Sequence, residues 1–252
     1  MEHLPLLAAL FFVAALVYSM AGLGGGSTYL ALLALFSFPY SFIPKVALFC
    51  NLAVVLSGFW FFTRAGYFSL KRALPFVVSS IPMAYWGGSI SIDKTLFTLL
   101  LGLSLAIASL RMFFADKSFQ SRPPLFWKNA WIVGLPMGAA LGFLSGVVGI
   151  GGGIYLTPLL LLMGWADAKQ AAASASFFIL VNSMAGLIGQ FSKSGLPSGN
   201  EISALWILLG AAFLGGQIGS RLGSQKISPL ILQRISASLI LYASGRLLIG
   251  LW

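Results

Sequence analysis

A glycine-rich run that occurs twice is the feature of this sequence that most limits how the chain can fold. Residues 22–26 read GLGGG and residues 149–153 read GIGGG, half the length of the 252-residue chain further on. Three more landmarks keep nearly the same spacing: Ser57-Gly58 with Ala185-Gly186, Gly66 with Gly195, and Gly87-Gly88 with Gly215-Gly216. Similarity at one fixed spacing indicates an internal duplication, so we expect two structurally related halves.

Composition places both halves in a membrane. Hydrophobic residues make up 59% of the chain and charged residues 8%, against about 25% charged residues in soluble domains. Matched apolar halves whose helices are interrupted by glycine are typical of membrane transporters. The first apolar stretch lacks a basic start, so we interpret it as a membrane helix rather than a signal peptide. The net charge of +10 is spread over connecting segments, which favours topology-setting charge and argues against nucleic-acid binding.

The sequence predicts an all-α polytopic membrane protein with five apolar segments in each half. The predicted ranges are 4–21, 27–38, 45–63, 72–90 and 95–114, then 130–147, 154–164, 170–191, 202–220 and 228–251. The second segment of each half is shorter than the ~20 residues that a helix needs to cross a bilayer. It is either a tilted short span or a half-helix that stops inside the membrane. A count that fuses each short segment with its neighbour gives eight spans instead of ten.

Charges in the predicted loops orient the two halves. The loop after the third segment carries Arg64, Lys71 and Arg72, whereas its counterpart carries Lys193 and Glu201. The loops after the fourth segments show the opposite bias. Because basic loops face the cytoplasm, equivalent loops lie on opposite sides, and the halves are inverted repeats with both chain ends outside. We expect a first transmembrane repeat over 1–115, a cytoplasmic linker over 116–128 and a second repeat over 129–252.

Polar residues within the predicted segments are the candidates for binding, because such groups are costly in a bilayer. Each glycine run precedes a helix start, whose free N–H groups and partial positive charge can hold an anion without a basic side chain. Two such ends, related by a pseudo-two-fold axis, can face one oxyanion. The predicted substrate-binding residues are Gly24, Gly25, Gly26, Ser27, Asn51, Gly151, Gly152, Gly153, Ser174, Ser176 and Asn182. The competing interpretation is packing, in which small residues let helices approach and hydroxyls bond a carbonyl one turn back.

One lysine stands at the start of the third segment in each half: Lys45 in the first half and Lys169 in the second. The sequence favours solvated helix-end lysines, whose apolar stems cover the helix while the charge reaches water. Their paired placement also fits a second interpretation, in which they draw anions to both mouths of a transporter.

Residue types that support catalysis are missing from the interior of the predicted segments. The five acidic residues and His3 lie at segment ends or in loops, and Cys50 is the single cysteine. No proton relay, nucleophile–base pair, metal cluster or phosphate-binding motif can be assembled from what remains. We therefore expect neither an enzyme nor a bound cofactor or metal.

One set of motifs in the second half resembles a known family. The glycine run leads into Thr157-Pro158-Leu159, an Ala-rich stretch over 171–176, Ala185-Gly186, and a run from Gly215 to Arg221. This pattern is similar to that of the TauE/SafE family of sulfite and organosulfonate exporters. The first half departs from it, since Ala31 stands where the pattern has proline, Phe49-Cys50-Asn51 replaces the Ser-rich stretch, and the arginine is missing.

The resemblance implies a multi-pass transporter of the inner membrane that moves small sulfur-containing oxyanions, such as sulfite or organosulfonates, by alternating access. Its implied partners are a small anionic substrate and the lipid bilayer, with a homo-oligomer as a further expectation. Export driven by the inside-negative potential needs no proton relay. The alternatives are uptake of a sulfur compound or another small organic anion, and a membrane scaffold that does not transport.

Overall fold

The computed structural model describes residues 3–20, 22–113, 130–195 and 199–223, together with scattered residues between 238 and 249. The predicted linker over 116–128 lies outside the described residues, as does most of the last predicted segment. The proposed repeat boundaries therefore stay predictions.

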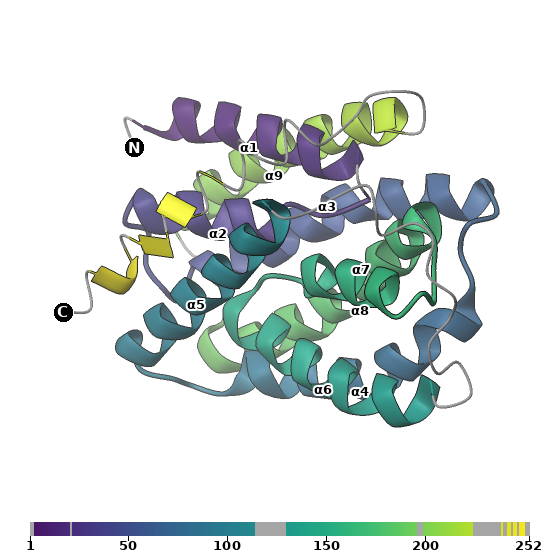
Figure 1. Cartoon of the computed structure of the whole chain (residues 1–252). Coiled ribbons are helices and arrows are strands. Elements are labelled where there is room, and N and C mark those ends of the chain that lie inside the picture. Colours follow the sequence, from purple (N-terminus) through teal and green to yellow (C-terminus); the bar gives the residue numbers. More distant parts are fainter. Residues whose placement is uncertain are drawn as a thin grey trace.

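Every regular element in the described part of the chain is a helix, as the sequence predicts (Figure 1). The first repeat forms α1 (Leu4–Met20), α2 (Gly26–Leu35), α3 (Ile43–Arg64), α4 (Leu70–Ser89) and α5 (Lys94–Phe113). The second forms α6 (Ala130–Val148), α7 (Gly153–Leu162), α8 (Ala168–Ser194) and α9 (Asn200–Gly223). By length and composition, four of these, α3, α6, α8 and α9, are apolar and long enough to cross a membrane. The all-α polytopic membrane fold is confirmed.

The short second segments are half-helices that begin inside the protein. α2 and α7 each have 10 residues, which is about 15 Å of helix and half of a bilayer core of about 30 Å. Each starts after a glycine in the left-handed conformation, Gly25 with φ 87° and Gly152 with φ 74°. Only glycine adopts this conformation without a steric cost, so the two glycine runs break the chain where the sequence places them.

Each broken pair folds back on itself. In the first repeat the ring of Tyr29, near the start of α2, stacks on Phe11 of α1 with 4.6 Å between centroids. The ring of Phe36, just after α2, lies 5.8 Å from His3, just before α1. α2 therefore runs antiparallel to α1 and returns to the end of the molecule at which α1 begins.

The two repeats are intertwined rather than side by side. In Figure 1, α1 and α9 lie along one face of the molecule, and α4 and α6 lie along the opposite face. Glycines let both pairs approach closely. Gly215 and Gly219 of α9 abut the carbonyls of Phe12 and Leu16, and four glycines of α6 abut carbonyls of α4. This is the small-residue packing that membrane helices use. Each outer layer thus contains one helix from each repeat.

The third helices of the repeats, α3 and α8, pack antiparallel in the centre of the molecule. Lys45, near the start of α3, bonds the carbonyl of Gly195, just after α8. Lys169, near the start of α8, bonds the hydroxyl of Tyr67, just after α3. The loop over 65–69 and the one that begins at Gly195 therefore lie at opposite ends of the molecule. Because these loops are equivalent in the two repeats, the arrangement agrees with the predicted inversion.

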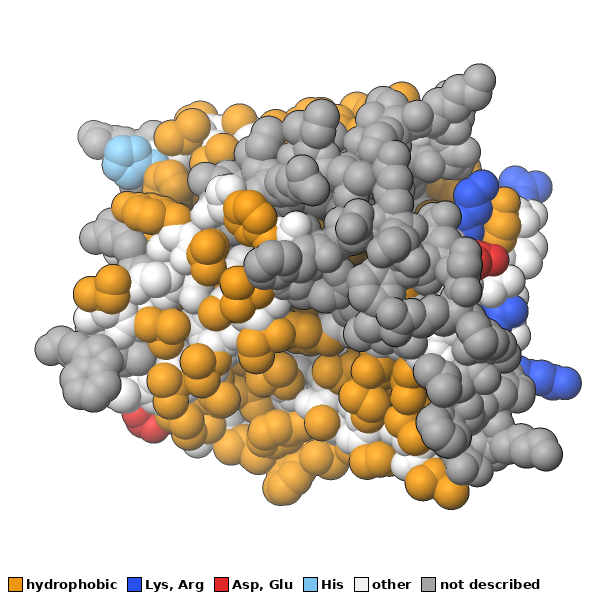
Figure 2. All heavy atoms as spheres, viewed as in Figure 1, with side chains coloured by type: hydrophobic (Ala, Val, Ile, Leu, Met, Phe, Trp, Pro, Cys, Tyr) orange, Lys and Arg blue, Asp and Glu red, His pale blue; other side chains and the backbone are white. Residues whose placement is uncertain are grey.

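Large apolar side chains are exposed around the molecule, and Figure 2 shows them covering much of one face. Trp60, Ile132 and Trp206 are 60%, 72% and 65% exposed, which suits contact with lipid tails. Lys and Arg gather at the edge where α3 ends and α4 begins. We call this edge the inner end, following the rule that basic loops face the cytoplasm. The opposite edge, where α1 begins in Figure 1, is the outer end.

Candidate functional site

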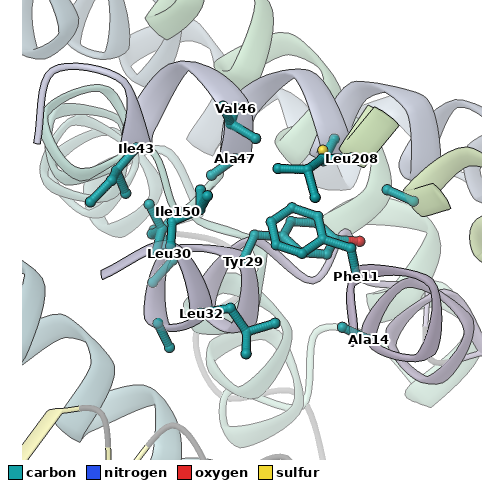
Figure 3. Close-up of a cluster of buried hydrophobic side chains, with 14 of the residues drawn as sticks. Phe11, Ala14, Tyr29, Leu30, Leu32, Ile43, Val46, Ala47, Ile150 and Leu208 are labelled. Atoms are coloured by element: carbon teal, nitrogen blue, oxygen red, sulfur yellow. The ribbon is translucent and has the colours of Figure 1, made fainter. Parts of the chain in front are cut away.

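The two glycine loops meet at the centre of the molecule. A Cβ atom added to Gly26 would lie 2.6 Å from the carbonyl oxygen of Ile150, so the backbones of the two loops approach too closely for any side chain between them. Figure 3 shows Ile150, from the second repeat, beside Leu30 and Ala47 of the first. The starts of α2 and α7, which follow these loops, are thereby placed next to one another.

Asn51 of α3 lies between the two loops. Its Nδ2 donates a hydrogen bond of 3.3 Å to the carbonyl of Ile150. A Cβ on Gly151 would lie 2.7 Å from the same nitrogen, and one on Gly24 would collide with Asn51 Oδ1. The side chain is fully buried, and Oδ1 has no hydrogen-bond partner. One amide from the first repeat thus contacts both loops and keeps a free acceptor in the interior.

The two repeats build these contacts in equivalent ways. As Asn51 fills the space beside Gly24 and Gly26, Ile179 of α8 fills the space beside Gly151 and Gly153. The first glycines of the runs also have matching neighbours: Gly22 abuts Ala172 of α8, and Gly149 abuts Pro44 of α3. Asn51 and Ile179 each cover glycines of their own repeat, whereas Ala172 and Pro44 each cover the first glycine of the other repeat. The geometry is pseudo-two-fold, but the chemistry is not, because the first repeat has an amide where the second has an alkyl side chain.

Hydroxyl groups gather on the first-repeat side of the site. Thr28 donates to the hydroxyl of Tyr18 at 2.9 Å, and the hydroxyl of Ser27 lies 3.4 Å from the same oxygen. The ring of Tyr29 covers Gly25, and its buried hydroxyl has no hydrogen-bond partner. Neither tyrosine was among the residues predicted from the sequence. Their signal was available, since Tyr18 precedes and Tyr29 follows the glycine run closely, away from the membrane interface where tyrosine usually lies.

The predicted polar residues of α8 fall on different faces of the helix. Ser176 donates to the carbonyl of Gly22 at 2.6 Å and to Ala172 at 2.9 Å, so it ties α8 to the first glycine loop. Ser174 is buried, and its hydroxyl group makes no hydrogen bond within the described residues. Asn182 Nδ2 bonds the carbonyl of Phe178 in its own helix at 2.8 Å, while its Oδ1 is unpartnered.

The structure therefore brings one part of the predicted site together and leaves the rest apart. Gly24, Gly26, Gly151 and Asn51 share one contact region. Ser27 and Gly25 border it through the two tyrosines, while Gly152 and Gly153 are covered by Phe178 and Ile179. Within the described residues, neither Ser174 nor Asn182 is among the nearest neighbours of a glycine in either loop, although both contribute unpaired buried atoms to α8. Whether any of these residues binds substrate stays a prediction.

The expectation of a solvated lysine is wrong for Lys45. This residue is only 4% exposed, and its ammonium group donates to the carbonyls of Gly195 at 2.8 Å and Ser194 at 3.4 Å. It satisfies the end of α8, where free carbonyls and the negative end of the helix dipole favour a cation. Lys169 is exposed as expected, and it bonds Tyr67 OH at 3.1 Å.

The site gathers several groups that can form hydrogen bonds. It offers the N–H groups at the starts of two half-helices and the polar side chains of Asn51, Ser27 and Tyr29. Unpaired polar groups cost free energy in a low-dielectric interior, so a partner that satisfies them is favoured there. No cluster of His, Cys, Asp or Glu that could hold a metal ion occurs among the described residues.

Paired half-helices inside inverted repeats, with polar groups at their starts, define a membrane transporter of the broken-helix type. Comparison with known proteins agrees with this class: residues 7–247 match the model of the sulfite exporter TauE/SafE family. The chain belongs to that family.

Three relatives carry the name of probable membrane transporter protein. The chain is 34% identical to y4hK of Sinorhizobium fredii over 95% of each chain. It is 26% identical to YunE of Bacillus subtilis over 94% of each chain. Identity to MJ0441 of Methanocaldococcus jannaschii is 28%, over 76% of this chain and 73% of the relative. No solved structure matches.

Proposed function

We propose that this membrane transporter exports small sulfur-containing oxyanions, such as sulfite or organosulfonates, across the inner membrane of the cell. The observation that carries the proposal is the meeting of two half-helix starts around Asn51. Oxyanions accept hydrogen bonds in several directions, and helix N-termini supply donors and a partial positive charge without a full opposite charge. Weak, shared binding of this kind lets an ion enter and leave.

The inverted repeats support alternating access as the mechanism. The central loops belong to both repeats, and each repeat closes one end of α3 and α8 through a lysine. Rocking one intertwined layer against the other would expose the centre to one end and then to the other, as in other inverted-repeat transporters.

Transport by purified protein in liposomes tests the proposal. We expect saturable flux of at least one of labelled sulfite, thiosulfate or a small sulfonate, and a loss of that flux in an Asn51→Leu variant. A folded wild-type protein that carries none of the three would overturn the substrate class and favour the scaffold alternative.

A further inference from the structure

A small cavity opens at the outer end of the molecule, away from the glycine loops. Its volume is about 180 Å³, well above the ~10–15 Å³ that a single water needs. The turns before α3 and α5, the start of α5 and the end of α8 enclose it, so both repeats contribute. The lining residues are Tyr40, Ser41, Pro44, Ser91, Ile92, Phe97, Lys193 and Ser194.

We propose that this cavity is a second anion-binding site, a vestibule that holds a small organosulfonate by its charged head. The identity of the anion as a sulfonate rests on the proposed function. That the ligand is an anion follows from the lining of the cavity. None of the described lining residues is acidic, and Lys193 supplies a full positive charge.

Lys193 has donors to spare. Its ammonium group carries three N–H bonds, and the structure gives it one acceptor, the carbonyl of Ile90 at 3.4 Å. The closest acid in sequence to the lining, Asp93, already accepts a hydrogen bond from the backbone of Leu96 at the start of α5. Within the described residues, no carboxylate pairs with the Lys193 charge.

A second lysine adds to the positive field. Lys45 lies near enough to Lys193 for the two charges to repel each other. Lys45 is itself held by the end of α8, so it cannot turn away without losing those bonds. Glu201 lies near enough to Lys45 to attract its charge, so Lys193 provides the larger share of the attraction for an anion in the cavity. Coulomb interactions between close charges are worth about 1 kcal/mol even at the dielectric of water.

The remaining lining fits a sulfonate better than a bare ion. Tyr40, Ser41 and Ser91 bring hydroxyl groups that can donate to the oxygens of the head. Phe97 and Ile92 bring apolar surface for a short organic group, and the ring of Tyr40 lies 6.0 Å from that of Phe97. The cavity thus combines a charged, hydroxyl-lined side with an apolar side.

A charged thiol reagent can test the site directly. Ser91→Cys is made in a Cys50→Ser background, because Ser91 is exposed and Cys50 is the buried native thiol. The protein is purified in a detergent without phosphate, so that no lipid headgroup competes. The rate of reaction with a methanethiosulfonate that bears a sulfonate is divided by the rate with one that bears a quaternary ammonium. We expect Lys193→Gln to lower this ratio about fivefold, equivalent to about 1 kcal/mol.

Lys94→Gln is the matched control, since Lys94 is an exposed lysine at the same end of the molecule but not part of the lining. It should leave the ratio nearly unchanged, and added methanesulfonate should slow labelling only where Lys193 is present. An equal fall in both lysine variants, or labelling that methanesulfonate does not slow, would overturn the vestibule.

The same measurements separate this inference from the proposed function. Protection by methanesulfonate without any flux of sulfur anions in liposomes would leave the vestibule standing and defeat the proposed function. Flux of sulfur anions without protection by methanesulfonate would support the proposed function and overturn the vestibule. Slowing that appears only when anionic lipid is added back would assign the cavity to a lipid headgroup and overturn the sulfonate assignment.

Discussion

Asn51 and Ile179 occupy equivalent places against the two glycine loops, yet only one of them can hydrogen-bond. The amide of Asn51 reaches the opposite repeat at Ile150, whereas Ile179 contacts Gly151 and Gly153 of its own repeat through alkyl groups. The two repeats therefore share the shape of this contact, but only the first places a polar side chain in it. The asymmetry at this pair makes the first-repeat side the polar side of the site.

Replacing Asn51 by leucine should separate binding from folding. The variant loses the bond to Ile150 but also removes an unpaired buried acceptor, so we expect unfolding stability to change by no more than about 1 kcal/mol. Flux in liposomes should fall at least tenfold. Ile179→Leu serves as the control for shape at the equivalent place and should keep most of the flux. A fully active Asn51→Leu protein would remove Asn51 from the binding site.

Gly26→Ala should fail for a steric reason. The new methyl group would meet the Ile150 carbonyl at 2.6 Å and Asn51 Nδ2 at 2.7 Å, and overpacking of a core costs about 1–3 kcal/mol. We expect a lower melting temperature in detergent and no flux. Gly210→Ala is the matched control, because nothing lies within 4 Å of its added Cβ. If both variants melted and transported like the wild type, the close approach of the two loops would be wrong.

At the scale of elements, the ends of α3 and α8 are joined by lysine bonds of unequal character. Lys45 is buried and holds two carbonyls, whereas Lys169 is exposed and holds one tyrosine, with its ammonium 5.0 Å from the ring centre. The Lys45 contact at the outer end, called here the outer tie, is therefore stronger than the Lys169 contact at the inner end. The α3–α8 pair is held together more firmly at its outer end.

Lysine-to-methionine changes should reveal this difference. Lys45→Met removes charge-assisted hydrogen bonds worth about 1.5–3 kcal/mol and leaves the end of α8 without a partner. Lys169→Met removes an exposed contact worth about 0.5–1 kcal/mol. Melting temperatures in detergent should therefore rank wild type, Lys169→Met and Lys45→Met in descending order. Equal losses would mean that burial does not strengthen the outer tie.

The elements were largely predictable from sequence, and their contacts were not. The glycine runs located both helix breaks, and the predicted ranges for α2 and α7 agree with the structure to within a few residues. Local pattern suffices there, because glycine in the left-handed conformation acts on its own neighbours. The contact of Asn51 with Ile150 joins residues 99 positions apart, and the burial of Lys45 depends on the end of α8. Neither has a local signature, and the repeat alignment pairs Asn51 with no polar residue.

For the molecule as a whole, the inverted repeats make a prediction about sidedness. Ala65 and Gly199 lie in equivalent, exposed loops at opposite ends of the α3–α8 pair. Single cysteines at these positions in a Cys50→Ser background should therefore label from opposite sides of the cell membrane, with Gly199→Cys reacting from outside and Ala65→Cys only after permeabilisation. Labelling of both from one side would contradict the inversion.

Transport should follow the membrane potential. Asp93, Asp167 and Glu201 lie at helix ends, and His3 lies just before α1, so no described carboxylate or imidazole sits at the centre to couple protons. An anion carried alone moves charge, and each charge gains about 2.3 kcal/mol per 100 mV. With a permanently ionised sulfonate, a valinomycin-set potential should change the flux in liposomes more than an equal pH gradient. Flux that answered only to pH would point to an unrecognised coupling group, with Lys45 the first to test.

Because each outer layer combines one helix from each repeat, the layers cannot be completed until the whole chain has been synthesised. When the ribosome has finished the first repeat, α1 still lacks α9, and α4 still lacks α6 and α8. The faces of α1 and α4 that will contact α9 and α6 can face lipid in the meantime. The close backbone contacts of these pairs cannot form until the second repeat is inserted. The newly inserted first repeat thus lacks the partner helix of each outer layer until the second repeat has been synthesised.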